Sequence, residues 1–240
     1  MGYLQEIGAW TQREVERRRE TRPFAGALYE PGRVKVIAEI KRASPSEGPI
    51  APSADAAEVA RRYEAGGAAA ISVLTSAKDF AGSLLDLARV RQVTDLPLLC
   101  KDFMVDPYQV VEARAHGADA ILVILALVDD GLAADLIQAA EDHQMDVLVE
   151  IHDEAELRRA LELGAPLIGV NARNLATLKV DPADQRRLLG AVPNGYLAVA
   201  ESGVASRADL DAAGEAGASA ALVGTAVMRN PDLLQELTRP

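Results

Sequence analysis

The sequence predicts an α/β fold in which eight parallel strands, each followed by a helix, close into a barrel. Three observations carry this prediction. Short, almost wholly apolar segments alternate with longer segments of helical periodicity along the whole chain. The apolar segments have the composition of strands that are buried on both faces, as in a parallel sheet. The length of 240 residues is close to the ~250 residues that a (β/α)₈ barrel, or TIM barrel, usually needs.

The expected strands and helices follow one another at regular intervals. The strands cover residues 34–41, 69–74, 97–101, 120–125, 146–150, 167–171, 196–201 and 220–223. The main helices cover residues 54–65, 83–93, 106–116, 131–143, 153–163, 182–189 and 207–216, and the last helix begins at residue 231. Gly66, Gly117, Gly164 and Gly217 each follow a helix, where glycine adopts a left-handed cap at little cost.

An extra helix is expected before the first strand, over residues 3–20. Residues 1–19 are amphipathic and charged and lack the apolar run of a signal peptide. We expect Trp10 on this helix to pack across the mouth of the barrel. The elements together predict a single domain over residues 1–240, in which residues 1–33 form an N-terminal extension.

The alternative architecture is an open, doubly wound sheet. That fold would place a glycine-rich fingerprint directly after its first strand. Here residues 42–48 follow the first strand, with the sequence Arg-Ala-Ser-Pro-Ser-Glu-Gly, which is no such fingerprint. We therefore favour the closed barrel.

The composition excludes several classes of function. A net charge of −11 disfavours nucleic acid and anionic membrane surfaces as partners. No segment of ~18 consecutive apolar residues is present, so no membrane span is expected and a cytoplasmic protein is predicted. Cys100, the only cysteine, excludes a disulfide and is expected to be a core thiol. The three histidines are scattered, which predicts no metal site. His152 follows Glu150 by two residues and either borders the site or, as we favour, lies at a helix start.

Polar side chains interrupt the apolar pattern at the carboxyl ends of the expected strands. They are Glu39 and Lys41, Lys101 and Asp102, Glu150, Asn171, and Glu201 and Ser202. The carboxyl ends of barrel strands converge on one face, where the active sites of such barrels lie. Structural salt bridges at this end of the barrel are the alternative. Because five strands contribute such groups at the same end, we favour a catalytic site.

A phosphate site is expected beside this cluster. Gly203 follows the seventh strand, and Gly224 and Thr225 follow the eighth, just before a short helical turn over residues 226–229. Barrels commonly bind phosphate at this place through backbone N–H groups and a helix N-terminus. Ser44 in the first loop could add a hydroxyl. A single glycine after a strand is usually only a turn, so the prediction depends on the two adjacent strands.

Five segments resemble the signatures of the indole-3-glycerol-phosphate synthase family. They are residues 38–46 (AEIKRASPS), 99–103 (LCKDF), 149–152 (VEIH), 169–175 (GVNARNL) and 200–203 (AESG). The similarity covers nearly the whole chain, and the first signature is highly specific. The resemblance implies a carboxy-lyase of tryptophan biosynthesis. It would convert 1-(2-carboxyphenylamino)-1-deoxyribulose 5-phosphate to indole-3-glycerol phosphate with loss of carbon dioxide and water, and it would need no metal or organic cofactor.

The resemblance also implies roles for individual residues. Lys101 resembles the general acid that protonates the substrate ketone, and a lysine in such a cluster is expected to have its pKa lowered toward the working pH. Lys41 resembles a second lysine near the departing carboxylate, and a candidate acid for the dehydration. Glu150 resembles the general base of the later step, and Glu39 a carboxylate that orients a lysine. Asn171 resembles a group that positions the substrate. Which lysine acts first stays open.

Further residues match substrate contacts of the family. Those expected to bind the organic part of the substrate are Arg173, Glu201, Ser202 and Phe103. Those expected to bind its phosphate are Ser44, Gly203, Gly224 and Thr225. Phe80, Phe103 and Leu125 are candidates for an apolar slot around the anthranilate ring, or else plain packing residues. Glu47 stands where a basic or neutral residue is common, which predicts a slightly weaker attraction for phosphate.

Two other functions compete with this interpretation. Another barrel enzyme on a phosphosugar, such as phosphoribosylanthranilate isomerase, would need one proton-transfer pair and not two lysines with three glutamates. A non-catalytic barrel that only binds phosphometabolites should have lost Lys101 or Glu150, and both are present. The expected partner is a small phosphorylated substrate. A monomer is expected, and transient contact with other tryptophan-pathway enzymes is left open.

Overall fold

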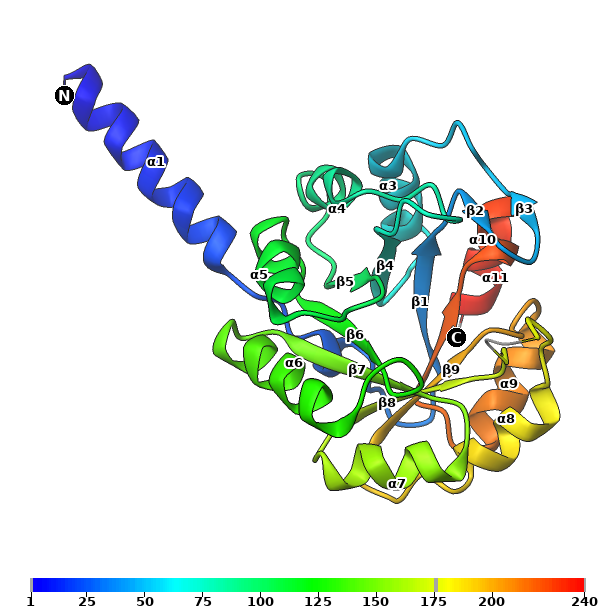
Figure 1. The fold of residues 1–240 in the computed structure, drawn as a ribbon. Helices are drawn as coiled ribbons and strands as arrows, with labels where there is room; N and C mark the ends of the chain where they lie inside the picture. The colour runs from blue at the N-terminus through cyan, green and yellow to red at the C-terminus, as the bar shows by residue number, and fades with distance from the viewer. Residues whose placement is uncertain (1, 175–176, 240) are drawn as a thin grey trace.

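A computed structural model of the protein describes residues 2–174 and 177–239. Eight parallel strands form a closed barrel with the neighbour order β1-β10-β9-β8-β7-β6-β5-β4, which confirms the predicted TIM barrel (Figure 1). The barrel strands are β1 (Lys35–Ile40), β4 (Ala70–Leu74), β5 (Leu98–Lys101), β6 (Ala120–Ile124), β7 (Asp146–Ile151), β8 (Leu167–Asn171), β9 (Leu197–Glu201) and β10 (Ala220–Val223). Each lies within two residues of its expected bounds.

Helices alternate with the strands and surround the barrel (Figure 1). They are α3 (Ala56–Ala65), α4 (Leu84–Arg91), α5 (Pro107–Ala115), α6 (Asp130–Asp142), α7 (Glu154–Glu162), α8 (Pro182–Leu189), α9 (Arg207–Glu215), α10 (Thr225–Arg229) and α11 (Asp232–Thr238). Aspartate or serine side chains cap the N-termini of α3 to α9 by accepting backbone N–H groups. These caps fix the residues at which the seven helices begin.

Two layers of apolar side chains hold the barrel together. The outer layer lies between strands and helices, and Cys100 belongs to it with no exposed surface, as expected for a core thiol. The inner layer fills the barrel and includes Ile37, Leu99 and Leu148. A short helix that the sequence pattern did not predict, α2 (Phe24–Ala27), inserts Phe24 into this inner layer. It therefore closes the amino-terminal end of the barrel with apolar contacts.

The glycines after the helices behave largely as predicted. Gly117, Gly164 and Gly217 have φ values of 98°, 72° and 107°, which is the left-handed conformation that glycine adopts easily. The prediction for Gly66 is wrong, since its φ is −79° and Gly67 takes the left-handed position with a φ of 83°. The paired glycines move the turn by one residue.

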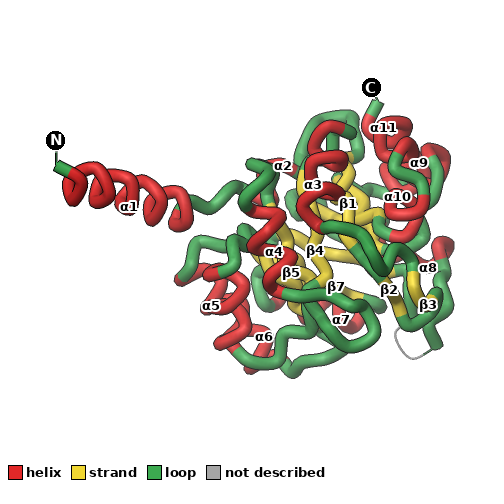
Figure 2. Tube along the Cα trace, turned by 90° about the horizontal axis from the view of Figure 1, so that it is seen from above, coloured by secondary structure: helices red, strands yellow, loops and turns green. Residues whose placement is uncertain are grey.

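The expected N-terminal helix is present as α1 (Tyr3–Arg19), but it does not reach the mouth of the barrel. Figures 1 and 2 show it projecting away from the barrel, and Trp10 is 55% exposed. The prediction for Trp10 is therefore wrong. The segment after α1 is tied to the opposite, amino-terminal end, because the Arg22 backbone N–H donates to Asp119 at 2.8 Å. Asp119 directly precedes β6.

The loop after β1 contains a small hairpin that was not predicted. Its strands are β2 (Ala43–Ser44) and β3 (Gly48–Pro49), which pair antiparallel. Arg42 anchors the base of this loop, since its Nη2 donates to Asp86 at 2.9 Å and its Nε to the carbonyl of Ala54 at 3.0 Å. The hairpin lies beside the polar end of the barrel and determines where Ser44 points.

Candidate active site

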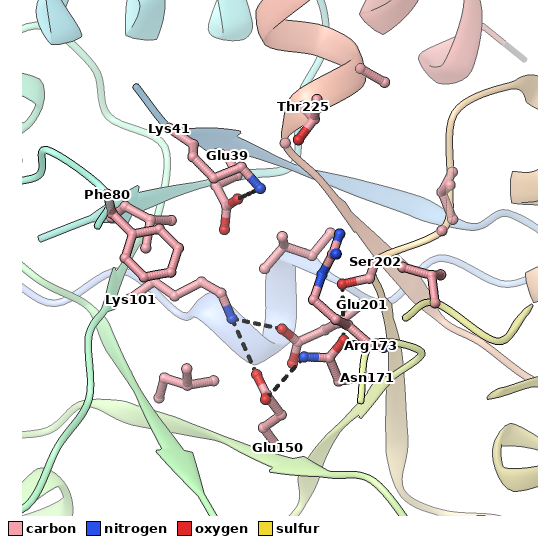
Figure 3. A pocket seen from close by; sticks show the side chains of 18 of the residues that line it. Glu39, Lys41, Phe80, Lys101, Glu150, Asn171, Arg173, Glu201, Ser202 and Thr225 are labelled. Atoms are coloured by element: carbon pink, nitrogen blue, oxygen red, sulfur yellow. Dashed lines mark hydrogen bonds and ion pairs between the residues drawn. The ribbon is translucent and has the colours of Figure 1, made fainter. Parts of the chain in front are cut away.

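A cavity of about 520 Å³ opens at the carboxyl ends of the strands. The predicted site residues that line it are Glu39, Lys41, Lys101, Phe103, Glu150, Asn171, Arg173, Glu201, Ser202, Gly203, Gly224 and Thr225. Ser44 does not line it, because it is buried in the β2–β3 hairpin, where its hydroxyl lies 3.5 Å from that of Ser46. The barrel thus brings together residues that lie far apart in the chain (Figure 3).

Lys101 lies between two glutamates. Its Nζ is 2.8 Å from Oε2 of Glu201 and 3.3 Å from Oε2 of Glu150, as the dashed lines in Figure 3 show. Burial opposes the charged lysine, but Glu201, Glu150 and Glu39 outweigh it and raise the pKa of Lys101. The expected lowering of this pKa is therefore wrong. Carboxylates outnumber cations around this amine, so it is held as an ammonium that can donate a proton.

The pKa values of Glu150 and Glu201 shift in opposite directions. Burial alone would raise the pKa of Glu150, but Lys101, His152 and Asn171 lower it. Burial raises the pKa of Glu201, and the charge of Glu150 adds to this rise while Lys101 opposes it. Two titratable groups with opposite shifts in one cavity give the site both an ionised base and a carboxyl that protonates readily.

Asn171 connects the cluster to the neighbouring strand. Its Nδ2 donates to Oε1 of Glu150 at 3.0 Å, and its Oδ1 accepts from the backbone N–H of Arg173 and the hydroxyl of Ser202, both at 2.9 Å. These partners fix which end of the amide faces Glu150. Asn171 therefore aims the carboxylate and is itself held on both sides.

Glu39 and Lys41 form a second pair on the first strand. Their side chains lie on the same face, as a spacing of two predicts, and Lys41 Nζ is 3.1 Å from Glu39 Oε1. Oε2 of Glu39 is buried without a hydrogen-bond partner among the described residues. Such an atom in a cavity is suited to a ligand.

Two glycines make room for these carboxylates. A Cβ on Gly169 would lie 2.1 Å from Glu201 Oε1, and a Cβ on Gly224 would lie 2.4 Å from Glu39 Oε1. Any larger side chain at either position would displace a glutamate. Gly169 was missed in the sequence, although a glycine inside an apolar strand is a known sign of a close approach.

Gly203, Gly224 and Thr225, three of the residues predicted to bind phosphate, line the cavity just after β9 and β10. Ser202 and Gly203 both have positive φ, 63° and 83°, and Gly224 precedes α10 directly. Arg229 at the end of α10 pairs with Glu47 of the first loop at 2.7 Å. Glu47 thus pairs with the charge of Arg229, which would otherwise be available to bind an anion.

An apolar wall faces the charged cluster. The rings of Phe80 and Phe103 lie with their centroids 6.0 Å apart and tilted by 47°, and both line the cavity. Leu122 and Ile124 line it as well. Leu125 belongs instead to the layer between strands and helices, so its assignment to a ring slot is wrong. It is the residue after β6, and it faces away from the barrel axis.

His152 borders the site without lining the cavity. Its Nε2 lies 3.2 Å from Oε1 of Glu150, and it directly precedes Asp153, the N-cap of α7, so both positions considered for it from the sequence are present. The spacing of two residues from Glu150 was the signal, since alternate strand positions share a face.

Residues 2–174 and 177–239 contain no group of three or more histidine, cysteine, aspartate or glutamate side chains that could hold a metal ion. Within the same residues, no helix combines the length and apolar character needed to cross a membrane.

The family model of indole-3-glycerol phosphate synthase matches residues 4–239. The chain belongs to this family. An indole-3-glycerol phosphate synthase of Parafrankia sp. is 52% identical over 226 residues, which is 94% of this chain and 84% of the relative. Another, of Micrococcus luteus, is 44% identical over 250 residues, or 96% and 93% of the two chains. The family predicted from the sequence motifs is thereby confirmed.

Solved structures of other proteins have a similar fold. The 3-hexulose-6-phosphate synthase of Salmonella typhimurium superposes with a TM-score of 0.67 at 16% identity, covering 85% of this chain and 95% of that chain. The thiamine phosphate pyrophosphorylase of Pyrococcus furiosus gives 0.62 at 19% identity, covering 85% and 93%. At these identities the likeness concerns the fold alone, and members of the indole-3-glycerol phosphate synthase family share it with other barrels.

Proposed function

We propose that the protein is a carboxy-lyase that closes the pyrrole ring of 1-(2-carboxyphenylamino)-1-deoxyribulose 5-phosphate, releasing carbon dioxide and water. The observation that carries the proposal is Lys101, a partly buried ammonium held at 2.8 Å and 3.3 Å by two glutamates from different strands. A proton donor so placed in a cavity is what activation of a ketone requires. The apolar wall opposite is suited to an aromatic ring.

In the first step Lys101 donates its proton to the ketone oxygen as the ring carbon that bears the carboxylate attacks the ketone carbon. The product of this step is an alcohol on a ring that has lost its aromaticity. Glu201 holds the Lys101 ammonium toward the cavity, and its own raised pKa makes it a short-range store for a proton. A preorganised donor of this kind stabilises the charge that develops on oxygen.

In the second step the carboxylate leaves as carbon dioxide, and its bonding electrons restore the aromatic ring. Lys41 is proposed to hold this carboxylate, and Glu39, at 3.1 Å, orients the lysine. The hydroxyl then leaves as water with a proton from Lys41. Glu150 removes a proton from the neighbouring carbon, which completes the indole. Asn171 and Arg173 position the chain of the substrate.

The phosphate is proposed to bind at the edge of the cavity that Gly203, Gly224 and Thr225 line, through backbone N–H groups, as is common in barrels of this kind. Ser44 would join it only if the β2–β3 hairpin rearranged. The proposal is for a monomeric, single-domain enzyme over residues 1–240. It needs no metal and no organic cofactor, and we assign it to the cytoplasm.

The test is to mix the purified protein with the carboxyphenylamino-deoxyribulose phosphate in EDTA, without added cofactor, and to follow indole fluorescence. We expect a rise that depends on enzyme concentration and carbon dioxide released in equal amount. Phosphate-dependent binding without a rise would contradict catalysis and indicate a barrel that only binds. The absence of both turnover and binding would contradict the proposed substrate.

A further inference from the structure

His152 lies between two carboxylates. Its Nδ1 is 3.1 Å from Oε2 of Glu156 in α7, and its Nε2 is 3.2 Å from Oε1 of Glu150 in β7. The first contact is a hydrogen bond, whereas the second is an ion-pair approach without the alignment of one. The His152 backbone N–H also donates to Oε2 of Glu156 at 2.7 Å. Glu156 thus fixes both the chain and the ring of His152.

We propose that His152 is a positioning residue for ring closure: as an imidazolium anchored by Glu156, it keeps the Glu150 base ionised and aimed while Lys101 is without its proton. The inference rests on the proposed function and on the role of Glu150 in it. It assigns to His152 and Glu156 a part in the reaction that the cavity alone does not suggest, since neither of them lines the cavity.

The charge of His152 follows from its surroundings. A neutral imidazole carries one proton and can satisfy only one of two facing carboxylates, whereas the imidazolium can satisfy both. Burial disfavours the charged ring, but Glu150 and Glu156 outweigh it and raise the pKa of His152 to about 10. The remaining charged neighbours of Glu150 lie two strands away on either side of β7, Lys101 on β5 and Glu201 on β9.

The two oxygens of Glu150 have different neighbours. Oε2 faces Lys101 at 3.3 Å, while Oε1 faces His152 and accepts from Asn171 at 3.0 Å. One oxygen is therefore held by fixed groups and the other is directed at the reacting part of the cavity. A carboxylate with both oxygens free would rotate, and its effective concentration as a base would fall.

The order of the proposed steps explains why Glu150 needs His152 as a second cation. Lys101 is one of the two cations beside Glu150 at the start, at 3.3 Å, but it loses its positive charge when it protonates the ketone. Without another cation, the buried Glu150 would then take up a proton, because burial raises the pKa of a carboxyl group. His152 is outside the cavity and does not exchange a proton with substrate, so its charge persists through that step.

The test compares four variants with the wild type: His152→Gln, Glu156→Gln, the double variant, and His143→Gln as control. His143 is exposed at the end of α6. We expect His152→Gln to lower kcat by about tenfold, the equivalent of one pKa unit, with KM changed less than threefold. The acidic limb of the kcat profile should move to higher pH by about one unit, since Glu150 then protonates more easily.

Glu156→Gln should shift the profile in the same direction by less, and the double variant should be no worse than His152→Gln, because both residues act through one carboxylate. His143→Gln should match the wild type. A separate measurement uses the nitrogen shifts of ¹⁵N-labelled histidine, with the His152 signal assigned from its absence in His152→Gln. We expect both ring nitrogens of His152 to be protonated at pH 8.

Three results would overturn the inference. The first is a His152→Gln variant that is less stable or less active but keeps the wild-type pH profile, since this would make the residue merely structural. The second is a neutral His152 ring at pH 8 in the wild type. The third is additive losses in the double variant. A wild type that makes no indole product would instead overturn the proposed function, which distinguishes the two failures.

Discussion

The two ends of the barrel both bury carboxylates, but the ends differ in how completely the carboxylate oxygens are hydrogen-bonded. At the amino-terminal end, Asp119 is 1% exposed, and both of its oxygens are used: Oδ1 accepts from the Arg22 backbone N–H, and Oδ2 accepts from the Leu98 backbone N–H and from Arg91, all at 2.8–2.9 Å. At the carboxyl end, Glu201 is also 1% exposed, yet its Oε1 has no hydrogen-bond partner among the described residues.

This difference separates structure from function. A buried carboxylate with complete partners stabilises the fold, because its removal would leave the partners unsatisfied. A buried carboxylate with an incomplete set costs free energy in the folded state and can be completed by a ligand. Equal burial therefore does not distinguish a structural carboxylate from a functional one. Substitutions at the two ends of the barrel test this difference.

Lys101→Ala should abolish almost all turnover. The variant loses the only proton donor that we place at the ketone, and we expect kcat to fall by about a thousandfold or more, while binding of the substrate is largely retained. Indole fluorescence measures the first quantity and titration calorimetry the second. The matched control is Lys35→Ala at the opposite end of the barrel, where Lys35 pairs with Glu30 at 2.8 Å, and its kcat should be unchanged. A normal kcat in Lys101→Ala would contradict the assigned role.

Asp119→Ala should lower the stability of the fold and leave catalysis unchanged. Removal of this carboxylate leaves Arg91 and two backbone N–H groups without it, and we expect the free energy of unfolding to fall by about 3 kcal/mol. Urea unfolding measures this loss. The kcat of the folded fraction should stay within twofold of the wild type, because Asp119 lies at the end away from the cavity. A large fall in kcat with unchanged stability would break the contrast between the two ends.

Gly169→Ala should damage the site through sterics alone. The added Cβ would lie 2.1 Å from Glu201 Oε1, so the carboxylate must move and Lys101 with it. We expect kcat to fall by about a hundredfold, which is the cost of a misplacement near 1 Å, and the free energy of unfolding to fall by ~1–3 kcal/mol.

Gly131→Ala is the control for this variant, because the nearest atom to a Cβ there is Asp129 Oδ1 at 3.5 Å. It lies within α6, so alanine should leave kcat unchanged and stabilise slightly. If Gly169→Ala kept wild-type activity, the position of Glu201 would not matter to the reaction. Crystals of Gly169→Ala would show directly whether the carboxylate has moved.

The barrel and most of the cavity could be predicted because they depend on local patterns. An apolar run predicts a buried strand wherever it lies, and parallel strands in a closed barrel bring their carboxyl ends together whatever the loops do. Glu39, Lys101, Glu150 and Asn171 lie within or at the end of such strands. Their convergence followed from the topology alone.

The errors fall where a residue depends on a loop or on a neighbour distant in sequence. Ser44 is turned away from the cavity by the pairing of two-residue strands in a hairpin, which no periodicity reveals. Trp10 lies on a helix whose direction its own periodicity does not reveal, and the chain after this helix is tied to Asp119 through Arg22, 97 residues apart. The pKa of Lys101 depends on how many carboxylates meet it in space, and sequence spacing does not supply that count.

The smallest prediction concerns the partly exposed charges at the rim of the cavity. Glu47 pairs with Arg229 at 2.7 Å, with side chains that are 28% and 55% exposed, and such pairs contribute less than about 1 kcal/mol to stability. Glu47→Gln removes a negative charge beside the proposed phosphate position and frees Arg229. We expect KM to fall about two- to threefold at low salt with kcat unchanged, and the gain to shrink as salt screens the charges. Glu30→Gln removes a similar charge at the amino-terminal end and should leave KM unaltered. Equal effects of the two substitutions would mean that net charge, and not the position of Glu47, governs attraction of the substrate.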